Sequence, residues 1–421
     1  MTPESPFKGL DAYTRADGER FFGRDREITE LYNRVQSGKL TLIYGLSGTG
    51  KSSLVRCGLA NRFRSREWFP VYVRRGEDIT AALTTALYDA WRAEADKQVG
   101  AAAGAGERTE RSSSRRRLLR RKAPATPPPS LEDFIALGDL EERIERVYYA
   151  VYRPIFFVFD QFEELYTINP FRKGEAYDAE ASDRWETEKH TFYRSVRDLL
   201  DSTRVSARLI FILREEWWAR MNVFEEYVPE LNENRMRLER MNDREMGEVI
   251  RQTAAFSQHN PAFRTVQLQE PVVVDILTTI RDERDFSLDL VDLQLYLDRL
   301  LEKVPAEGPA IFTPALVKDN QLDNVIDDFL STSLEAIEKE LIGRWRAAEP
   351  TAERGKLAGR AKGIPLEILF RLVTDEGTKK VTAEEELLDH PFFQRRSITP
   401  EDIRFCLQRL AENKLINSYD S

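Results

Sequence analysis

Short apolar runs alternate with amphipathic helical patterns along much of the chain. Four runs of five or six residues have the composition of strands buried on both faces: Leu40–Tyr44, Phe69–Val73, Ile155–Phe159 and Arg208–Leu213. Such strands are typical of a parallel sheet whose connections are helices. The pattern therefore predicts an α/β domain, which we place at residues 1–236.

Beyond residue 236 the apolar positions follow helical spacing. Asn242–Glu245 can cap a helix, Pro271 opens another, and Leu288–Leu301 is leucine-spaced and amphipathic. Ile364–Val373 and Thr399–Leu415 continue the same pattern. We predict a helical lid domain over 237–305, and over 306–421 a helical linker with a winged-helix-like domain that is incomplete at its C-terminus.

One stretch, residues 100–130, breaks this periodicity. It runs from AAAGAG through SSSRRRLLRRK to ATPPPS, a composition that cannot bury enough apolar surface to fold alone. Residues 107–122 carry a net charge of +6, although the whole chain carries −9. We predict a disordered insertion that is either a solvated loop or an anchor on nucleic acid or anionic lipid.

Candidate chemistry begins directly behind the first apolar run. Residues 45–52 read GLSGTGKS, a complete G-x-x-x-x-G-K-S phosphate loop between a strand and a helix. Its glycines let backbone N–H groups approach a phosphate, Lys51 can reach the β- and γ-phosphates, and Ser52 can bind Mg²⁺. The predicted nucleotide contacts are Gly45, Leu46, Ser47, Gly48, Thr49, Gly50, Lys51, Ser52 and Ser53.

A second candidate group follows the run Ile155–Phe159. Asp160 stands at the carboxyl end of this strand, where α/β sheets bind ligands, and it is the second predicted Mg²⁺ ligand. Glu163 and Glu164 are the candidates to polarise the attacking water, with a slight preference for Glu164. The alternative is that both glutamates only begin a helix, where the helix dipole favours acids.

A third group follows the run that ends at Leu213. Arg214 lies at the tip of a predicted core strand, where a cation needs an anionic partner. A γ-phosphate would serve, and its loss on hydrolysis would be felt by the strand. The alternative is an ion pair between Arg214 and Glu215 or Glu163.

Four ordered motifs together resemble a known family. They are the entry segment with residues 7–13 (FKGLDAY) and 21–28 (FFGRDREI), the phosphate loop, residues 160–165 (DQFEEL), and the strand 208–214, whose final arginine precedes an acidic-aromatic pair. In this order the chain resembles the bacterial novel-STAND group of signalling ATPases, which are related to NACHT and AAA+ proteins. The resemblance implies a P-loop NTPase sheet flanked by helices, followed by lid and winged-helix domains.

The same resemblance implies a site and a mode of action. Phe22, Gly23 and Arg24 would pack on the adenine and ribose of ATP or ADP, Mg²⁺ would accompany the nucleotide, and Arg214 would act as the sensor. Many members have a proline that contacts the base at a position matching residues 286–295, but this stretch has none. Locking of the nucleotide through that element is therefore not implied.

Composition limits the cellular compartment and the kinds of chemistry that we expect. The chain has 421 residues, and its two cysteines, Cys57 and Cys406, cannot form a disulfide framework, which favours a reducing cytoplasm. No apolar run approaches the ~18 residues of a membrane span. The three histidines have no metal-ligand spacing, so zinc chemistry is not expected.

Two functions stay open at this point. The first is a slowly hydrolysing, ATP-dependent signalling switch that forms a homo-oligomer, in bacterial conflict or antiviral defence as the resemblance implies. Its output would come from a separate effector or a C-terminal sensor region, because Met1 lies almost directly before the family signature and the chain ends at Ser421. The second is a DNA-associated AAA+-like ATPase, but the last predicted helix has no net basic face.

Overall fold

A computed structural model of the chain describes residues 3–76, 78–106, 128–167, 179–281, 287–321, 325–348, 354–373, 382, 387–388, 390–413 and 415–416. The chain divides into two compact units, which are described separately. The sheet unit consists of Arg26–Leu46 and Gly58–Leu238, and the lid unit consists of Met1–Asp25, Ser47–Cys57 and Glu239–Ser421. The break at Leu238 falls close to the expected domain limit at residue 236, but the N-terminal residues and the phosphate loop group with the lid unit.

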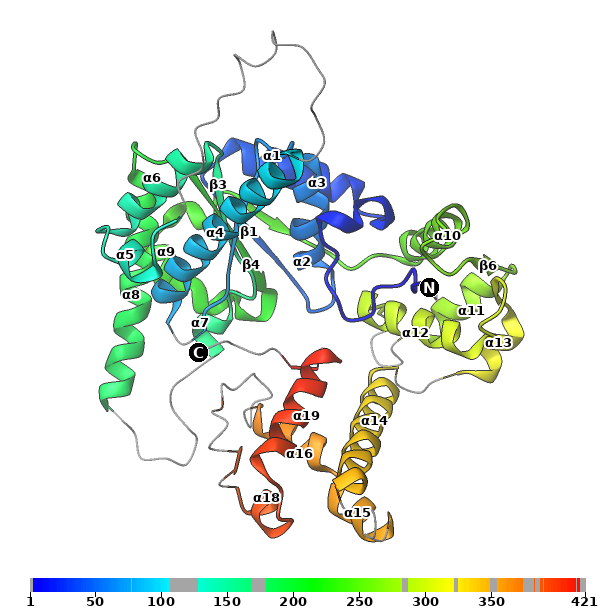
Figure 1. Cartoon of the computed structure of the whole chain (residues 1–421). Helices are drawn as coiled ribbons and strands as arrows, with labels where there is room; N and C mark the ends of the chain where they lie inside the picture. Colours follow the sequence, from blue (N-terminus) through cyan, green and yellow to red (C-terminus); the bar gives the residue numbers. More distant parts are fainter. Residues whose placement is uncertain are drawn as a thin grey trace. The chain divides into compact units, whose positions relative to one another are not determined.

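Among its described residues, the sheet unit contains one sheet of five parallel strands. Their order is β2 (Phe69–Val73), β3 (Ile155–Phe159), β4 (Ala207–Arg214), β1 (Leu40–Gly45) and β5 (Arg235–Arg237) (Figure 1). The four predicted strands are confirmed, and every residue of β3 is buried, as expected for a strand covered on both faces. The short edge strand β5 was missed because Met236 is its single apolar residue.

Aromatic side chains fill both faces of this sheet. On one face Phe159 stacks on Phe211 with 4.7 Å between the ring centroids, and the centroids of Phe211 and Phe224 are 5.5 Å apart. On the other face the ring centroids of Phe156 and Trp68 are 4.4 Å apart. Successive side chains of a strand point to opposite faces, so neighbouring residues of β3 belong to different layers.

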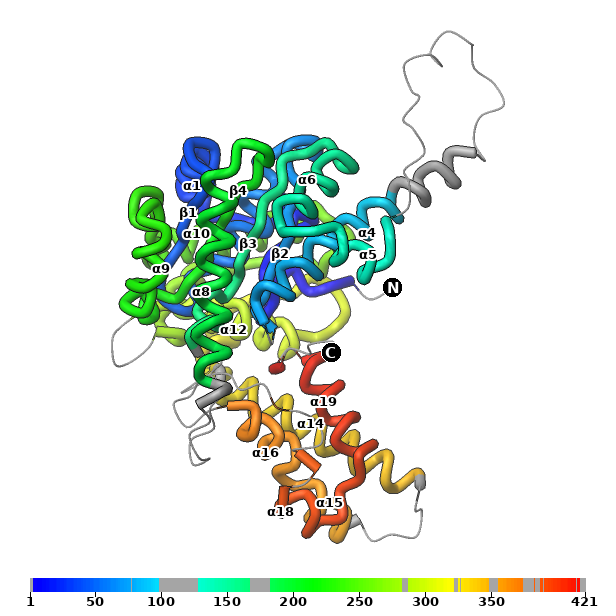
Figure 2. The backbone as a smooth tube through the Cα atoms, turned by 90° about the vertical axis from the view of Figure 1, so that its left-hand side faces the viewer, coloured from blue at the N-terminus to red at the C-terminus, as the bar shows by residue number. Residues whose placement is uncertain are grey.

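Helices connect the strands, and Figure 2 shows α4 beside α5 and α6. The segment behind the phosphate loop consists of α2 (Lys51–Ser53), a π-helical turn (Leu54–Leu59) and α3 (Ala60–Arg62). The other connecting helices are α1 (Asp25–Ser37), α4 (Ile79–Gly106), α5 (Leu131–Ile135), α6 (Leu140–Val151), α7 (Glu164–Thr167), α8 (Ala179–Asp201) and α9 (Asn222–Tyr227).

Helix α4 changes the limits of the predicted insertion. It continues to Gly106, so residues 100–106 are helical and the expectation of disorder from residue 100 onward was wrong for them. Alanine dominates this stretch, and alanine has the highest helix propensity of all residues. Residues 107–127, which include the basic run, lie outside the described residues.

The first part of the lid unit is a helical layer with a two-stranded parallel sheet. Its elements are α10 (Asp243–His259), β6 (Val266–Leu268), α11 (Val272–Thr279), α12 (Leu290–Lys303), β7 (Ala310–Phe312) and α13 (Pro314–Asp319). The predicted caps are confirmed: Asn242 and Glu245 form a capping box, and Pro271 precedes α11. N-terminal Phe7 completes the apolar core of this layer, stacking on Phe312 at 6.2 Å.

The second part of the lid unit has its own small core. It is formed by α14 (Val325–Ala348), α15 (Arg354–Ala361), α16 (Ile364–Arg371), α18 (Pro391–Arg395) and α19 (Pro400–Glu412) (Figure 2). Thr399 and Asp402 form a capping box at the start of α19, and Asp402 also accepts a hydrogen bond from Trp345 Nε1 at 2.8 Å. All named elements of this part are helices, and residues 374–381 and 383–386 lie outside the described residues. The winged helix therefore stays a prediction.

Within the described ranges, no helix combines the length and the apolar composition that a bilayer crossing requires.

Candidate nucleotide-binding site

The phosphate loop has the backbone form that its glycines predict. Gly48 and Gly50 have φ angles of 75° and 87°, in the left-handed region that favours glycine. The first turn of α2 follows immediately at Lys51, whose side chain is largely buried. The loop therefore places the N–H groups of a helix N-terminus and one lysine where an anion can be held.

Arg24 supports this loop from behind. Its guanidinium is buried, and Nη2 donates to the carbonyl oxygens of Thr49 at 3.0 Å and of Glu239 at 2.9 Å. Phe22 packs edge-on against Phe256 of α10. A Cβ on Gly23 would lie 2.7 Å from Val249, so α10 packs directly on this backbone. Phe22, Gly23 and Arg24 thus join the loop to the lid, and their expected contact with adenine and ribose stays a prediction.

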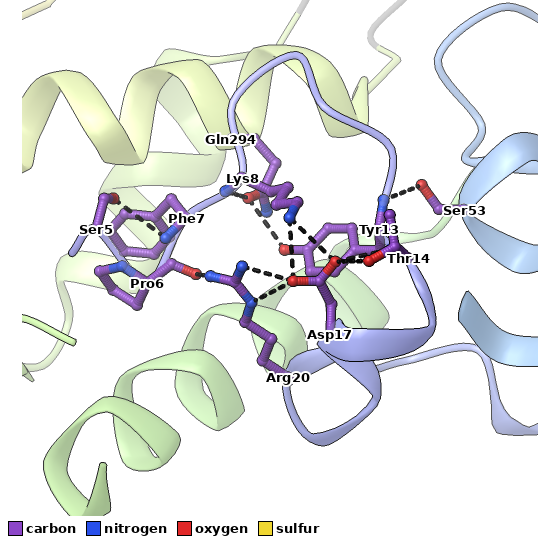
Figure 3. Close-up of polar contacts among 10 residues, drawn as sticks. All are labelled: Ser5, Pro6, Phe7, Lys8, Tyr13, Thr14, Asp17, Arg20, Ser53 and Gln294. Carbon is purple, nitrogen blue, oxygen red and sulfur yellow. Dashed lines mark hydrogen bonds and ion pairs between the residues drawn. The ribbon is translucent and has the colours of Figure 1, made fainter. Parts of the chain in front are cut away.

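The N-terminal segment makes a second connection, shown in Figure 3. The backbone N–H of Tyr13 donates to Ser53 Oγ at 3.1 Å, directly behind the loop. The Tyr13 hydroxyl and the backbone N–H of Lys8 both donate to Gln294 Oε1 of α12, at 3.2 Å and 2.9 Å. Burial raises the pKa of Tyr13 to about 12, so this phenol stays a neutral donor. One tyrosine therefore links the phosphate loop to a lid helix.

Asp17 holds the segment in this shape. Its carboxylate accepts hydrogen bonds from the backbone and hydroxyl of Thr14, from Arg20 Nη2 at 2.6 Å and from Lys8 Nζ at 3.0 Å (Figure 3). Burial alone would raise the pKa of this carboxyl, but the hydrogen bonds outweigh it and the pKa lies well below its ordinary value. Asp17 is therefore an ionised hub that orders residues 8–20.

The acidic group lies at the carboxyl edge of the sheet. Asp160 is buried directly after β3, and Gln161 adopts a left-handed φ of 60°. This turn brings the Phe162 N–H to the Ile212 carbonyl of β4 at 2.9 Å. As a result the next residue, Glu163, lies beside the end of β4.

Arg214 meets Glu163 at this edge. Its Nε lies 3.2 Å from Glu163 Oε1, and its backbone N–H donates to Oε2 at 3.3 Å. Arg214 pairs in register with Gly45, the first residue of the phosphate-loop motif. The ion pair that the sequence left as an alternative is thus present, while 43% of the arginine side chain stays exposed. The sensor role of Arg214 stays a prediction.

The family is decided by a match over most of the sequence. The sequence model of the family described as Novel STAND NTPase 1 matches residues 6–302. The chain belongs to the novel STAND NTPase family. This confirms the resemblance drawn from the four motifs, and nucleotide binding by this STAND NTPase follows from its family.

Comparison with solved structures finds similarities at low sequence identity. The chain is similar to a Walker-type ATPase of Pyrococcus abyssi, with 13% identity, coverage of 94% of this chain and 99% of that chain, and a TM-score of 0.42. It is similar to the ADP form of the ORC2 protein of Aeropyrum pernix, with 14% identity, coverage of 98% and 90%, and a TM-score of 0.44. It is also similar to the ORC1 protein of the same organism in complex with DNA, with 14% identity, coverage of 93% of this chain and 84% of that chain, and a TM-score of 0.43. These values are too low to transfer a ligand or partner, and no curated protein matches the chain.

Sequence reasoning missed the residues that connect the loop to the lid. Tyr13, Asp17 and Gln294 were not singled out, although two signals were present. Thr14 and Asp17 have the spacing of a capping box. Gln294 is a buried polar residue within the leucine-spaced pattern of α12, and a buried amide needs a hydrogen-bond partner.

Proposed function

We propose that this STAND NTPase is an ATP-dependent molecular switch that hydrolyses its nucleotide slowly and assembles into a homo-oligomer. The observation that carries the proposal is the set of hydrogen bonds that links the phosphate loop to lid elements. The Thr49 carbonyl accepts a hydrogen bond from Arg24. Tyr13 donates one hydrogen bond to Ser53 and another to Gln294 of α12. A ligand can drive a conformational change only by binding two states differently, and these bonds give phosphate a route to the lid.

A nucleotide and Mg²⁺ fit the residues present. The left-handed glycines Gly48 and Gly50 and the helix start at Lys51 form the cradle for phosphates. The hydroxyl of Ser52 and the carboxylate of Asp160 are hard oxygen donors of the kind that Mg²⁺ prefers. When bound, the ion neutralises charge on the β- and γ-phosphates.

The contacts of the two glutamates separate their proposed roles. Glu163 is held by the backbone and the guanidinium of Arg214, which engage both of its carboxylate oxygens and fix its orientation. Glu164 is buried at the first position of α7. We assign the polarisation of the attacking water to Glu164, and to Glu163 the positioning of Arg214, which would read the γ-phosphate.

The biological setting in the proposal is bacterial conflict or antiviral defence, which the family resemblance supports. The output would come from a partner effector or from a further sensor region acting with the oligomer. Within the described residues, α19 does not favour the DNA-binding alternative. Its Arg409 is paired with Glu340 at 2.8 Å and with Glu412, which reduces the basic character of this helix.

Binding to a Lys51→Ala variant tests the proposal. The variant loses one charge-assisted phosphate contact, worth about 1.5–3 kcal/mol, so calorimetry should show ATP affinity reduced at least about tenfold. Lys339→Ala, which removes a lysine that is 75% exposed on α14, is the matched control and should bind as the parent does. Equal ATP affinity in the parent and the Lys51→Ala variant would refute the assignment of the phosphate loop.

Mass photometry with ATP and with ADP tests the switch. Assembly that depends on ATP supports the proposal, and one oligomeric state under both conditions contradicts it. A mobility shift of duplex DNA at moderate salt, independent of nucleotide, would instead favour the DNA-associated ATPase.

A further inference from the structure

An aspartate of the lid lies directly against the phosphate loop. Asp289 precedes α12, and its carboxylate is so close to Gly48 that an added Cβ there would lie 2.0 Å from Oδ2 and 2.3 Å from Oδ1. The next residue, Leu290, is the nearest neighbour of the Cβ position of Gly50, at 3.4 Å. The first residues at this end of α12 therefore cover both left-handed glycines of the loop.

The structural role of Asp289 does not require its charge. Its Oδ1 accepts the N–H of Val291 at 2.7 Å and caps α12. Asparagine and serine cap helices about as well as aspartate does. A neutral residue at this position would hold the helix without placing an anion on the loop.

The surroundings of the carboxylate show a conflict of charge. Burial raises the pKa of Asp289, and the N–H of Val291 and the cations Arg240 and Lys51 lower it only in part. Lys51 is the same cation that the loop provides for phosphate. A carboxylate and a phosphate close to one loop repel each other, and they compete for the same lysine.

We propose that Asp289 sets the nucleotide affinity of this protein, because its carboxylate competes with the nucleotide phosphates for the loop and for Lys51 and thereby weakens binding and speeds release. The proposal rests on the proposed binding of ATP at the loop. It makes Asp289 an affinity-determining residue of the site, in addition to its function as a helix cap.

The test compares Asp289→Asn with the parent and uses a fluorescent ATP analogue, ADP and AMP as probes. The variant keeps the cap and loses the charge, so ATP should bind about tenfold tighter or more, and release should be slower in stopped flow. The gain should fall from ATP to ADP to AMP, because the repulsion grows with the number of phosphate charges. Asp139→Asn, the same change at the cap of α6, is the matched control and should leave binding unchanged.

Two outcomes overturn the inference. Equal or weaker ATP binding by Asp289→Asn, with an unchanged melting temperature, shows that the carboxylate does not compete with phosphate. An equal gain for AMP and ATP shows that the effect is not one of phosphate charge. Asp289→Ser keeps the cap in a shorter side chain and serves as the second variant if the first fails to fold. Insensitivity of ATP binding to Lys51→Ala would overturn the proposed function as well, which separates the two failures.

Discussion

The phosphate loop and the acidic edge of the sheet are built by different means. The loop is a backbone structure: two left-handed glycines and a helix start define it, and Arg24 and Tyr13 hold it through main-chain atoms or a single hydroxyl. The acidic edge is a side-chain structure, in which Glu163 takes Arg214 as its partner. The backbone conformation of the loop follows from its local residue types, whereas the contacts of a side chain depend on which groups the fold brings near it. The roles at the acidic edge are therefore the ones that experiments must separate.

Splitting the two glutamates should give the largest effect. Glu164→Gln removes the charge that polarises water while keeping the shape, so single-turnover hydrolysis should fall by about 10²–10⁴-fold with ATP binding retained. Glu163→Gln should have a smaller effect, because a glutamine oxygen can still accept from the Arg214 N–H. Loss of turnover in Glu163→Gln together with full turnover in Glu164→Gln would reverse the assignment.

Arg214→Ala should shift the preference between nucleotides. ADP should still bind through the loop and Lys51, whereas the preference for ATP should fall by about ten- to a hundredfold, since a charge-assisted hydrogen bond is worth ~1.5–3 kcal/mol. ATP-dependent assembly in mass photometry should be lost with it. Arg237→Ala, which breaks the ion pair of Arg237 with Glu215, the residue after β4, is the control. ATP-induced assembly that survives in Arg214→Ala would leave Arg214 with only its ion pair.

Two alanine substitutions in the phosphate loop should have a smaller effect, which is measured on the free energy of unfolding. Gly48→Ala and Gly50→Ala both place a Cβ at a positive φ, at a cost of about 1–2 kcal/mol each. Only Gly48→Ala also collides with Asp289, at 2.0 Å, so it should lower the free energy of unfolding further. Adding Asp289→Ser should recover part of that extra loss, and a double-mutant cycle from urea unfolding measures it. Equal losses in the two single variants would contradict the close approach of Asp289.

Asp17→Asn should give an effect of similar size that depends on pH. The amide keeps fewer of the hydrogen bonds to Lys8, Thr14 and Arg20, so the free energy of unfolding at pH 7 should fall by about 1–3 kcal/mol. Because the folded state lowers the pKa of Asp17, its stabilisation is present above the ordinary pKa near ~4 and is lost as the pH falls through the lowered value. Unfolding of parent and variant should therefore converge in acid. Asp89→Asn, on an exposed position of α4, is the control, and a deficit that persists unchanged in acid would contradict the ionised hub.

The fold could be predicted where local pattern and burial agree. The run of β3 is apolar at every position and is buried at every position, and the cap of α10 follows from Asn242 and Glu245. The edge strand β5 could not be predicted, because pairing with β1 defines it and its own residues are mostly polar. The limit of α4 at Gly106 was missed because small residues were read as a linker when helix propensity decided their structure.

The candidate site, like the fold, could be predicted only where neighbouring residues in the sequence define it. The phosphate loop is contiguous in sequence, so its geometry follows from residue type and order. The contacts of Lys8 with Gln294 and of Gly48 with Asp289 join residues more than two hundred positions apart, and no local pattern encodes such a pairing. The ion pair between Arg214 and Glu163 forms because the left-handed turn at Gln161 places Glu163 beside the end of β4. A single sequence does not reveal that turn.

The contacts of the N-terminal segment also set an order for folding during synthesis. Lys8 leaves the ribosome 286 residues before its partner Gln294, a delay of about 15–60 s at 5–20 residues per second. Phe7 waits longer still for Phe312, its stacking partner in the lid core. The residues of the sheet unit are all translated within this interval, by Leu238. Phe7 and Lys8 therefore cannot make these two contacts with the lid unit until Phe312 and Gln294 have been translated.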